Sequence, residues 1–204
     1  MNHKVNNVQM LHEDAMYLYN TLVMGGESSA DSILHNLSQG IENLKTNWKG
    51  KDAGYRIQEV ITIHNAMVTV RNALAQLASD SAKIAVNYRE IQNANGAGLE
   101  TLSLISFDAK TFLGDYTDTA DTIDINPEAE AGKNFIDAAN NMIDTFKTDV
   151  KFRYQYIMEN WTIGSGRDAA QGAFDSFLAN ADKYREVLAD TTSNITKALQ
   201  NYTF

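Results

Sequence analysis

The sequence contains no cysteine and only one proline among its 204 residues. The absence of cysteine excludes a disulfide framework, a thiolate metal site and a cysteine nucleophile. A single proline is far below the usual share of about 5%, which excludes collagen-like and proline-rich chains and favours long uninterrupted helices. Long apolar runs and an apolar N-terminal stretch are also missing, so we expect no membrane insertion and no cleavable signal peptide.

Basic side chains are scarce relative to acidic ones. The 17 lysines and arginines against 26 aspartates and glutamates give a formal net charge of -9. Such a charge repels phosphate backbones and anionic lipid, so we expect no nucleic acid among the ligands. Hydrophobic residues make up 44% of the chain, which is enough for a buried core.

Apolar residues recur at alternating steps of three and four in three long stretches, 60–91, 136–157 and 170–202. This spacing places them on one face of a helix and is typical of coiled-coil packing. The second stretch follows Asn126-Pro127-Glu128, which supplies an N-cap, a first-turn proline and an acid near the helix dipole. We therefore predict three long helices.

Shorter periodic stretches flank these helices. Apolar stripes at 8–22 and 30–48 are separated by Gly25-Gly26, and Ser28 and Ser29 are candidate caps of the second stripe. A weaker stripe predicts a further helix over 99–116. The acidic, threonine-rich residues 114–126 indicate a connector.

A short motif occurs twice. Gly50-Lys51-Asp52-Ala53 and Gly166-Arg167-Asp168-Ala169 each follow a tryptophan, Trp48 or Trp161, and each opens a long periodic stretch. Glycine allows the positive φ that ends one helix, aspartate offers its carboxylate to the N–H groups of the next, and tryptophan covers the end of the pair. The two tryptophans suit either this role or that of docking residues for a partner.

The repeat predicts an all-α fold whose four-helix-bundle core consists of two tandem helical hairpins, with extra shorter helices. We divide the chain into a first hairpin with an extra N-terminal helix (1–98), a helical and acidic connector (99–126) and a second hairpin (127–204). One hairpin cannot bury both apolar stripes, but two hairpins packed face to face can.

Trp48-Lys49-Gly50, between two long heptad helices, resembles the WXG family of helical proteins similar to the early secretory antigens of type VII secretion. Proteins of this family are hairpins with Trp-x-Gly at the bend, and they dimerise into four-helix bundles. The resemblance covers about 28–93 and 127–202, and it implies an intramolecular pseudo-dimer. The longer second bend, from Trp161 to Gly166, departs from the motif.

The resemblance implies a non-enzymatic substrate, carrier or adaptor of type VII secretion. Its partners would be secretion machinery or another WXG-type protein, and it would be secreted or lie at the cell surface. The family's export signal, Tyr-x-x-x-Asp/Glu, is matched only by Tyr55 and Glu59, at the start of a helix rather than beyond its end. The alternative is a cytoplasmic helical-bundle interaction module unrelated to secretion.

The sequence gives little support for catalysis, metal binding or a cofactor. The histidines, His3, His12, His35 and His64, lack the spacing of a helical zinc site. The aspartates of the connector lack the ligand pattern of an EF-hand loop. The glycines at 164 and 166 follow a predicted helix, whereas a dinucleotide site requires a preceding strand.

Overall fold

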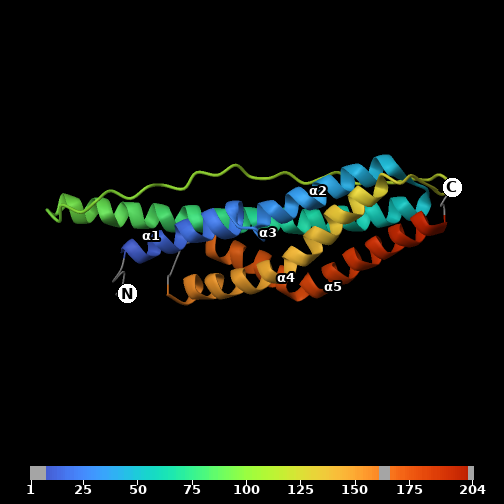
Figure 1. The fold of residues 1–204 in the computed structure, drawn as a ribbon. Coiled ribbons are helices and arrows are strands. Elements are labelled where there is room, and N and C mark those ends of the chain that lie inside the picture. Colours follow the sequence, from blue (N-terminus) through green and yellow to red (C-terminus); the bar gives the residue numbers. More distant parts are fainter. Residues whose placement is uncertain (1–7, 161–165, 202–204) are drawn as a thin grey trace.

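The computed structural model describes residues 8–160 and 166–201 and has an all-α fold, as predicted (Figure 1). Its helices are α1 (Val8–Tyr17), the π-helical η1 (Leu18–Gly25), α2 (Ala30–Asn47), α3 (Lys51–Ala94), α4 (Ala129–Asn160) and α5 (Gly166–Asn201). Two short strands, β1 (Trp48–Lys49) and β2 (Asp124–Ile125), form an antiparallel pair that the sequence analysis did not predict.

The four long helices form a bundle of two hairpins. α2 packs against α3 and α4 packs against α5, while contacts of α2 with α4 and of α3 with α5 join the two pairs. The bend between α2 and α3 lies at one end of the bundle, and α4 ends and α5 begins toward the other end (Figure 1). The hairpins are therefore antiparallel to each other.

α3 is the central helix, because α1, η1, α2 and α5 all pack against it. Its predicted stripe is buried from Val60 to Ser81, and further side chains such as Ile61 and Ala75 are buried on other faces. The last members of the stripe, Tyr88 and Ile91, are 41% and 58% exposed. The end of α3 extends beyond the other helices (Figure 1), and α1 still reaches Arg89, whose Nη2 donates to Gln9 Oε1 at 3.1 Å.

α2 and α4 approach closely at two glycines. A Cβ added to Gly40 would lie 2.5 Å from Ile136 Cδ1 and 3.2 Å from Gly132 O, and one added to Gly132 would lie 2.6 Å from Asn43 Oδ1. Asn43 Oδ1 also accepts a hydrogen bond from Gly132 N at 3.1 Å. The contact between the two halves of the chain thus depends on the absence of side chains at this crossing.

The prediction of a helix over 99–116 is wrong. Residues 99–120, the connecting segment, contain no regular secondary structure and run back along α3 (Figure 1). α3 has 44 residues and is about 66 Å long, whereas an 18-residue helix would span only about 27 Å. The connecting segment is extended because it must return the chain from Ala94 to the start of α3.

Two predicted helix starts are confirmed. Ser29 caps α2 by accepting a hydrogen bond from Ser32 N at 3.2 Å. Before α4, Asn126 Oδ1 accepts from Glu128 N at 3.1 Å, as expected of an N-cap, but Pro127 and Glu128 form a turn and the α-helix begins at Ala129.

Candidate functional site

The bend between α2 and α3 contains three of the predicted site residues. Gly50 has a φ of +114°, so the bend has the positive φ that its glycine was expected to supply. Trp48 is 2% exposed and lies in β1 opposite Ile125. Because its indole is buried, Trp48 covers the end of the bundle and presents no docking surface.

Asp52 was expected to bond the N–H groups at the start of α3, but the first of these groups, Lys51 N, donates to Ala120 O at 3.1 Å. No side chain of α3 caps its first turn, and Asp52 is exposed. Asp118 Oδ2 instead accepts from Gly50 N at 3.1 Å, and its Oδ1 accepts from Ala120 N at 2.9 Å. These backbone hydrogen bonds, the one from Ala120 first, lower the pKa of Asp118.

The second motif lies at the opposite end of the bundle. Gly166 is the first residue of α5, and Asp168 is an exposed acid in its first turn. Trp161 lies outside the described residues. The structure therefore does not bring the two motifs together into one site.

An open pocket of about 320 Å³ lies between α2, α3 and the connecting segment. Its polar lining consists of Asp31, His35, Ser38, His64, Lys110 and Thr111. None of these residues was predicted to form a site, because they come from three segments that only the tertiary fold brings together.

A serine–histidine pair lies in the wall of this pocket. His64, which is 5% exposed, has Nε2 at 3.1 Å from Ser38 Oγ and Nδ1 at 3.1 Å from Asn65 Oδ1. Asn65 Nδ2 donates to Leu113 O, which fixes the amide so that Oδ1 faces Nδ1. The neutral imidazole ring of His64 therefore carries its proton on Nδ1, which donates to Asn65, while Nε2 accepts a hydrogen bond from the Ser38 hydroxyl.

This pair is poorly suited to hydrolysis. Burial lowers the pKa of His64, which keeps the ring neutral, and Nδ1 meets an amide oxygen where a catalytic triad places a carboxylate. The amide cannot stabilise an imidazolium through charge. Ser38 also lies within α2, where the helix occupies the nearby backbone N–H groups that an oxyanion hole requires. We therefore regard the pair as a polar contact between α2 and α3.

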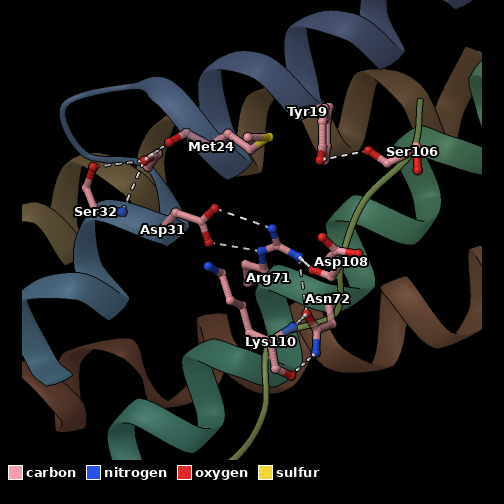
Figure 2. Close-up of polar contacts among 10 residues, drawn as sticks. Tyr19, Met24, Asp31, Ser32, Arg71, Asn72, Ser106, Asp108 and Lys110 are labelled. Carbon is pink, nitrogen blue, oxygen red and sulfur yellow. Dashed lines mark hydrogen bonds and ion pairs between the residues drawn. The ribbon is translucent and has the colours of Figure 1, made fainter. Parts of the chain in front are cut away.

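Asp31, in the lining of this pocket, forms an ion pair with a buried arginine (Figure 2). Arg71 is 3% exposed and donates through Nε and Nη2 to the two oxygens of Asp31, at 3.0 and 3.3 Å. Its Nη1 donates to Asp108 O at 2.7 Å. A longer bond runs from Nη1 to Asn72 Oδ1 at 3.4 Å. One guanidinium thus joins α2, α3 and the connecting segment, and four charge-assisted hydrogen bonds fix its position.

Comparisons of the chain with protein-family models, with curated proteins and with solved structures find no match. Among residues 8–160 and 166–201, no helix has the length and apolar character needed to cross a membrane. Within the same described ranges, no three His, Asp or Glu side chains are grouped closely enough to hold a metal ion.

Proposed function

We propose that this chain is a WXG-type helical protein that acts through protein–protein contacts as a substrate, carrier or adaptor of type VII secretion. The observation that carries the proposal is the arrangement of its two hairpins. They pack antiparallel within one chain, and Trp48 and Gly50 lie at the bend of the first. The resemblance implies a four-helix bundle formed by two hairpins of one chain, and the two hairpins here pack in that way.

The exposed end of α3 supports a role in protein contacts. Tyr88 and Ile91 continue the apolar stripe into the last turns of α3, where both side chains are exposed. Exposed apolar side chains in line with a buried seam are suited to contact a helix of another protein.

Tyr55 and Glu59 are the candidate export signal. Tyr55 is 61% exposed on the first turns of α3, and a hydrogen bond to Glu59 raises its pKa. The two side chains lie one helical turn apart, so a receptor could contact both. Their position at the start of a helix, rather than after its end, instead favours the alternative of a cytoplasmic interaction module.

The test is export from native cells with and without the type VII motor ATPase. We expect the chain in the culture supernatant of the parent strain and its loss on deletion of the motor. Tyr55→Ala should abolish export, whereas Phe152→Ala, which removes another exposed aromatic ring, should not. Equal amounts in the supernatants of both strains would refute the secretion role and leave the cytoplasmic module.

A further inference from the structure

A row of polar side chains on α3 holds the connecting segment. The residues are spaced by seven or fourteen along the helix, and each bonds a main-chain group of the segment; they are Gln58, Asn65, Asn72, Ser79 and Asn93. Helical residues seven apart lie on the same face, two turns from each other. The row is therefore a polar line along one face of α3 from Gln58 to Ser79, and Asn93 continues it after the apolar Val86.

The asparagines of the row each use both amide atoms on a single residue. Asn65 Nδ2 donates to Leu113 O at 2.9 Å, and its Oδ1 accepts from Leu113 N at 2.8 Å. Asn72 makes the same pair of bonds to Lys110, both at 2.9 Å (Figure 2). Asn93 repeats the pattern on Leu99, at 2.9 and 2.7 Å. Each amide thus satisfies both backbone groups of its partner residue, as a neighbouring strand would.

The spacing of the row matches that of an extended chain. Seven helical residues rise about 10.5 Å, and three residues of an extended chain span about 10 Å. Three successive members of the row, Gln58, Asn65 and Asn72, meet Tyr116, Leu113 and Lys110, which are three residues apart. For these three members the fit is a property of helix and strand geometry, whereas Ser79 and Asn93 meet Ile105 and Leu99 at other spacings.

The connecting segment buries few side chains. Of the described residues 99–120, only Ile105 is fully buried, whereas Leu104 and Phe112 are 64% and 63% exposed. Other side chains of the bundle also bond its main chain, such as Tyr19 to Ser106 O at 3.0 Å (Figure 2). The segment is held through main-chain groups that every residue except proline carries in full, and also through four partly buried side chains that pack against the core, Leu102, Phe107, Leu113 and Tyr116.

We propose that the polar row of α3 is a binding site for the main chain of an extended polypeptide. Residues 99–118 are its resident occupant, and an extended segment of a partner protein replaces them. The incoming segment must carry N–H groups at three-residue spacing, so proline is excluded there, and it must place an apolar residue where Ile105 packs. Such replacement would operate whether or not the chain is exported.

Tethering at both ends favours the resident segment, because it gives an effective concentration in the millimolar range. A partner segment therefore binds well only where the resident is loosened. The full chain carrying Lys110→Pro and Leu113→Pro supplies this condition, since it removes two N–H donors from the segment and leaves α3 intact. A labelled peptide of sequence 99–118 is the probe, and fluorescence anisotropy measures its binding.

The matched control is the full chain with Ala109→Pro and Phe112→Pro, because these positions are exposed and donate none of the bonds of the row. We expect the peptide to bind the first variant at least tenfold more tightly than the control. A peptide with proline at 110 and 113 should bind at least tenfold more weakly. A peptide in which Leu104 and Phe112 are replaced by serine should bind as the parent peptide does.

Adding Asn65→Leu and Asn72→Leu to the first variant should abolish binding. Equal binding of the proline peptide, or equal binding to the variant and its control, would overturn the proposal. If circular dichroism shows that the first variant has lost its helices, the test is made on the unaltered chain by measuring amide hydrogen exchange in the connecting segment. Millimolar parent peptide should then accelerate exchange of the Lys110 and Leu113 amides, and the proline peptide should not; no acceleration by the parent peptide would also overturn the proposal.

Discussion

Replacing Gly40 by alanine should destabilise the protein, although alanine is the better helix former. At an open helical position, Gly→Ala stabilises by about 1 kcal/mol. At Gly40 the new methyl group would lie 2.5 and 2.9 Å from Ile136 Cδ1 and Cγ1, inside a fully buried contact between α2 and α4. Overpacking of this kind costs about 1–3 kcal/mol. We expect a net loss of about 1 kcal/mol in the free energy of unfolding, measured by urea denaturation.

Gly172→Ala is the matched control, because Gly172 lies in α5 with no atom within 4 Å of an added Cβ. It should stabilise by about 1 kcal/mol. Ile136→Ala removes the atoms that clash, so the double variant with Gly40→Ala should be more stable than the sum of its single changes by about 1–2 kcal/mol. Equal stabilisation by Gly40→Ala and Gly172→Ala would refute the close approach of the helices.

Three further predictions concern polar and bend residues. Asp31→Asn should lower the free energy of unfolding by about 3 kcal/mol in urea denaturation, because the buried Arg71 guanidinium loses its counter-charge. As a control, Glu42→Gln, which removes the charge of an exposed ion pair, should change the free energy of unfolding by less than about 0.5 kcal/mol. Burial lowers the pKa of His64 in the folded protein, so the imidazole takes up a proton in the unfolded chain at a higher pH than in the folded one. The free energy of unfolding should therefore decline as pH falls from about 6.5 to the pKa of the folded state. His64→Gln should remove this part of the decline. Gly50→Ala should destabilise by about 1–3 kcal/mol in the same assay, because φ is +114° and the new Cβ would lie 2.8 Å from Thr122 O; a loss below 0.3 kcal/mol would contradict this bend geometry.

The helices of the bundle could be predicted because their signals are local. Heptad spacing, the Ser29 and Asn126 caps and the Gly50 bend each depend on residues close in sequence. The exposed end of the α3 stripe was not foreseen, because periodicity shows which residues share a face and not how far a partner helix extends. Ile91 therefore fits the pattern although it is exposed.

The connecting segment was mispredicted because its conformation is set by the length of α3. The apolar spacing of Leu99 and Leu102 resembles a helix, but only an extended chain covers the distance back to Gly50. The same long-range path explains why Asp118, and not the nearby Asp52, bonds the N–H group of Gly50. The seven-residue spacing of the α3 amides was present in the sequence, but its meaning depended on knowing what runs beside it.

The pocket residues could not be assembled from sequence patterns. Asp31 and Arg71 are 40 residues apart and lie on different helices, so no spacing rule joins them. The close approach of α2 and α4 could not be predicted either. A glycine such as Gly40 inside a helical pattern indicates only reduced helix stability, and its packing role becomes visible when the structure places Gly132 and Ile136 opposite it. These features depend on the packing of one hairpin on the other.

Cross-linking tests most directly whether the two hairpins of one chain pack antiparallel. The chain contains no cysteine, so pairs can be introduced without background. Asn36 and Met142 are in contact across α2 and α4, with Asn36 Nδ2 at 3.7 Å from Met142 Sδ. A short bis-maleimide should join Asn36→Cys to Met142→Cys within one 22.6 kDa chain, and should not join Asn36→Cys to Glu130→Cys. Cross-linking of the second pair instead of the first, or products found only between chains, would contradict the antiparallel intramolecular bundle.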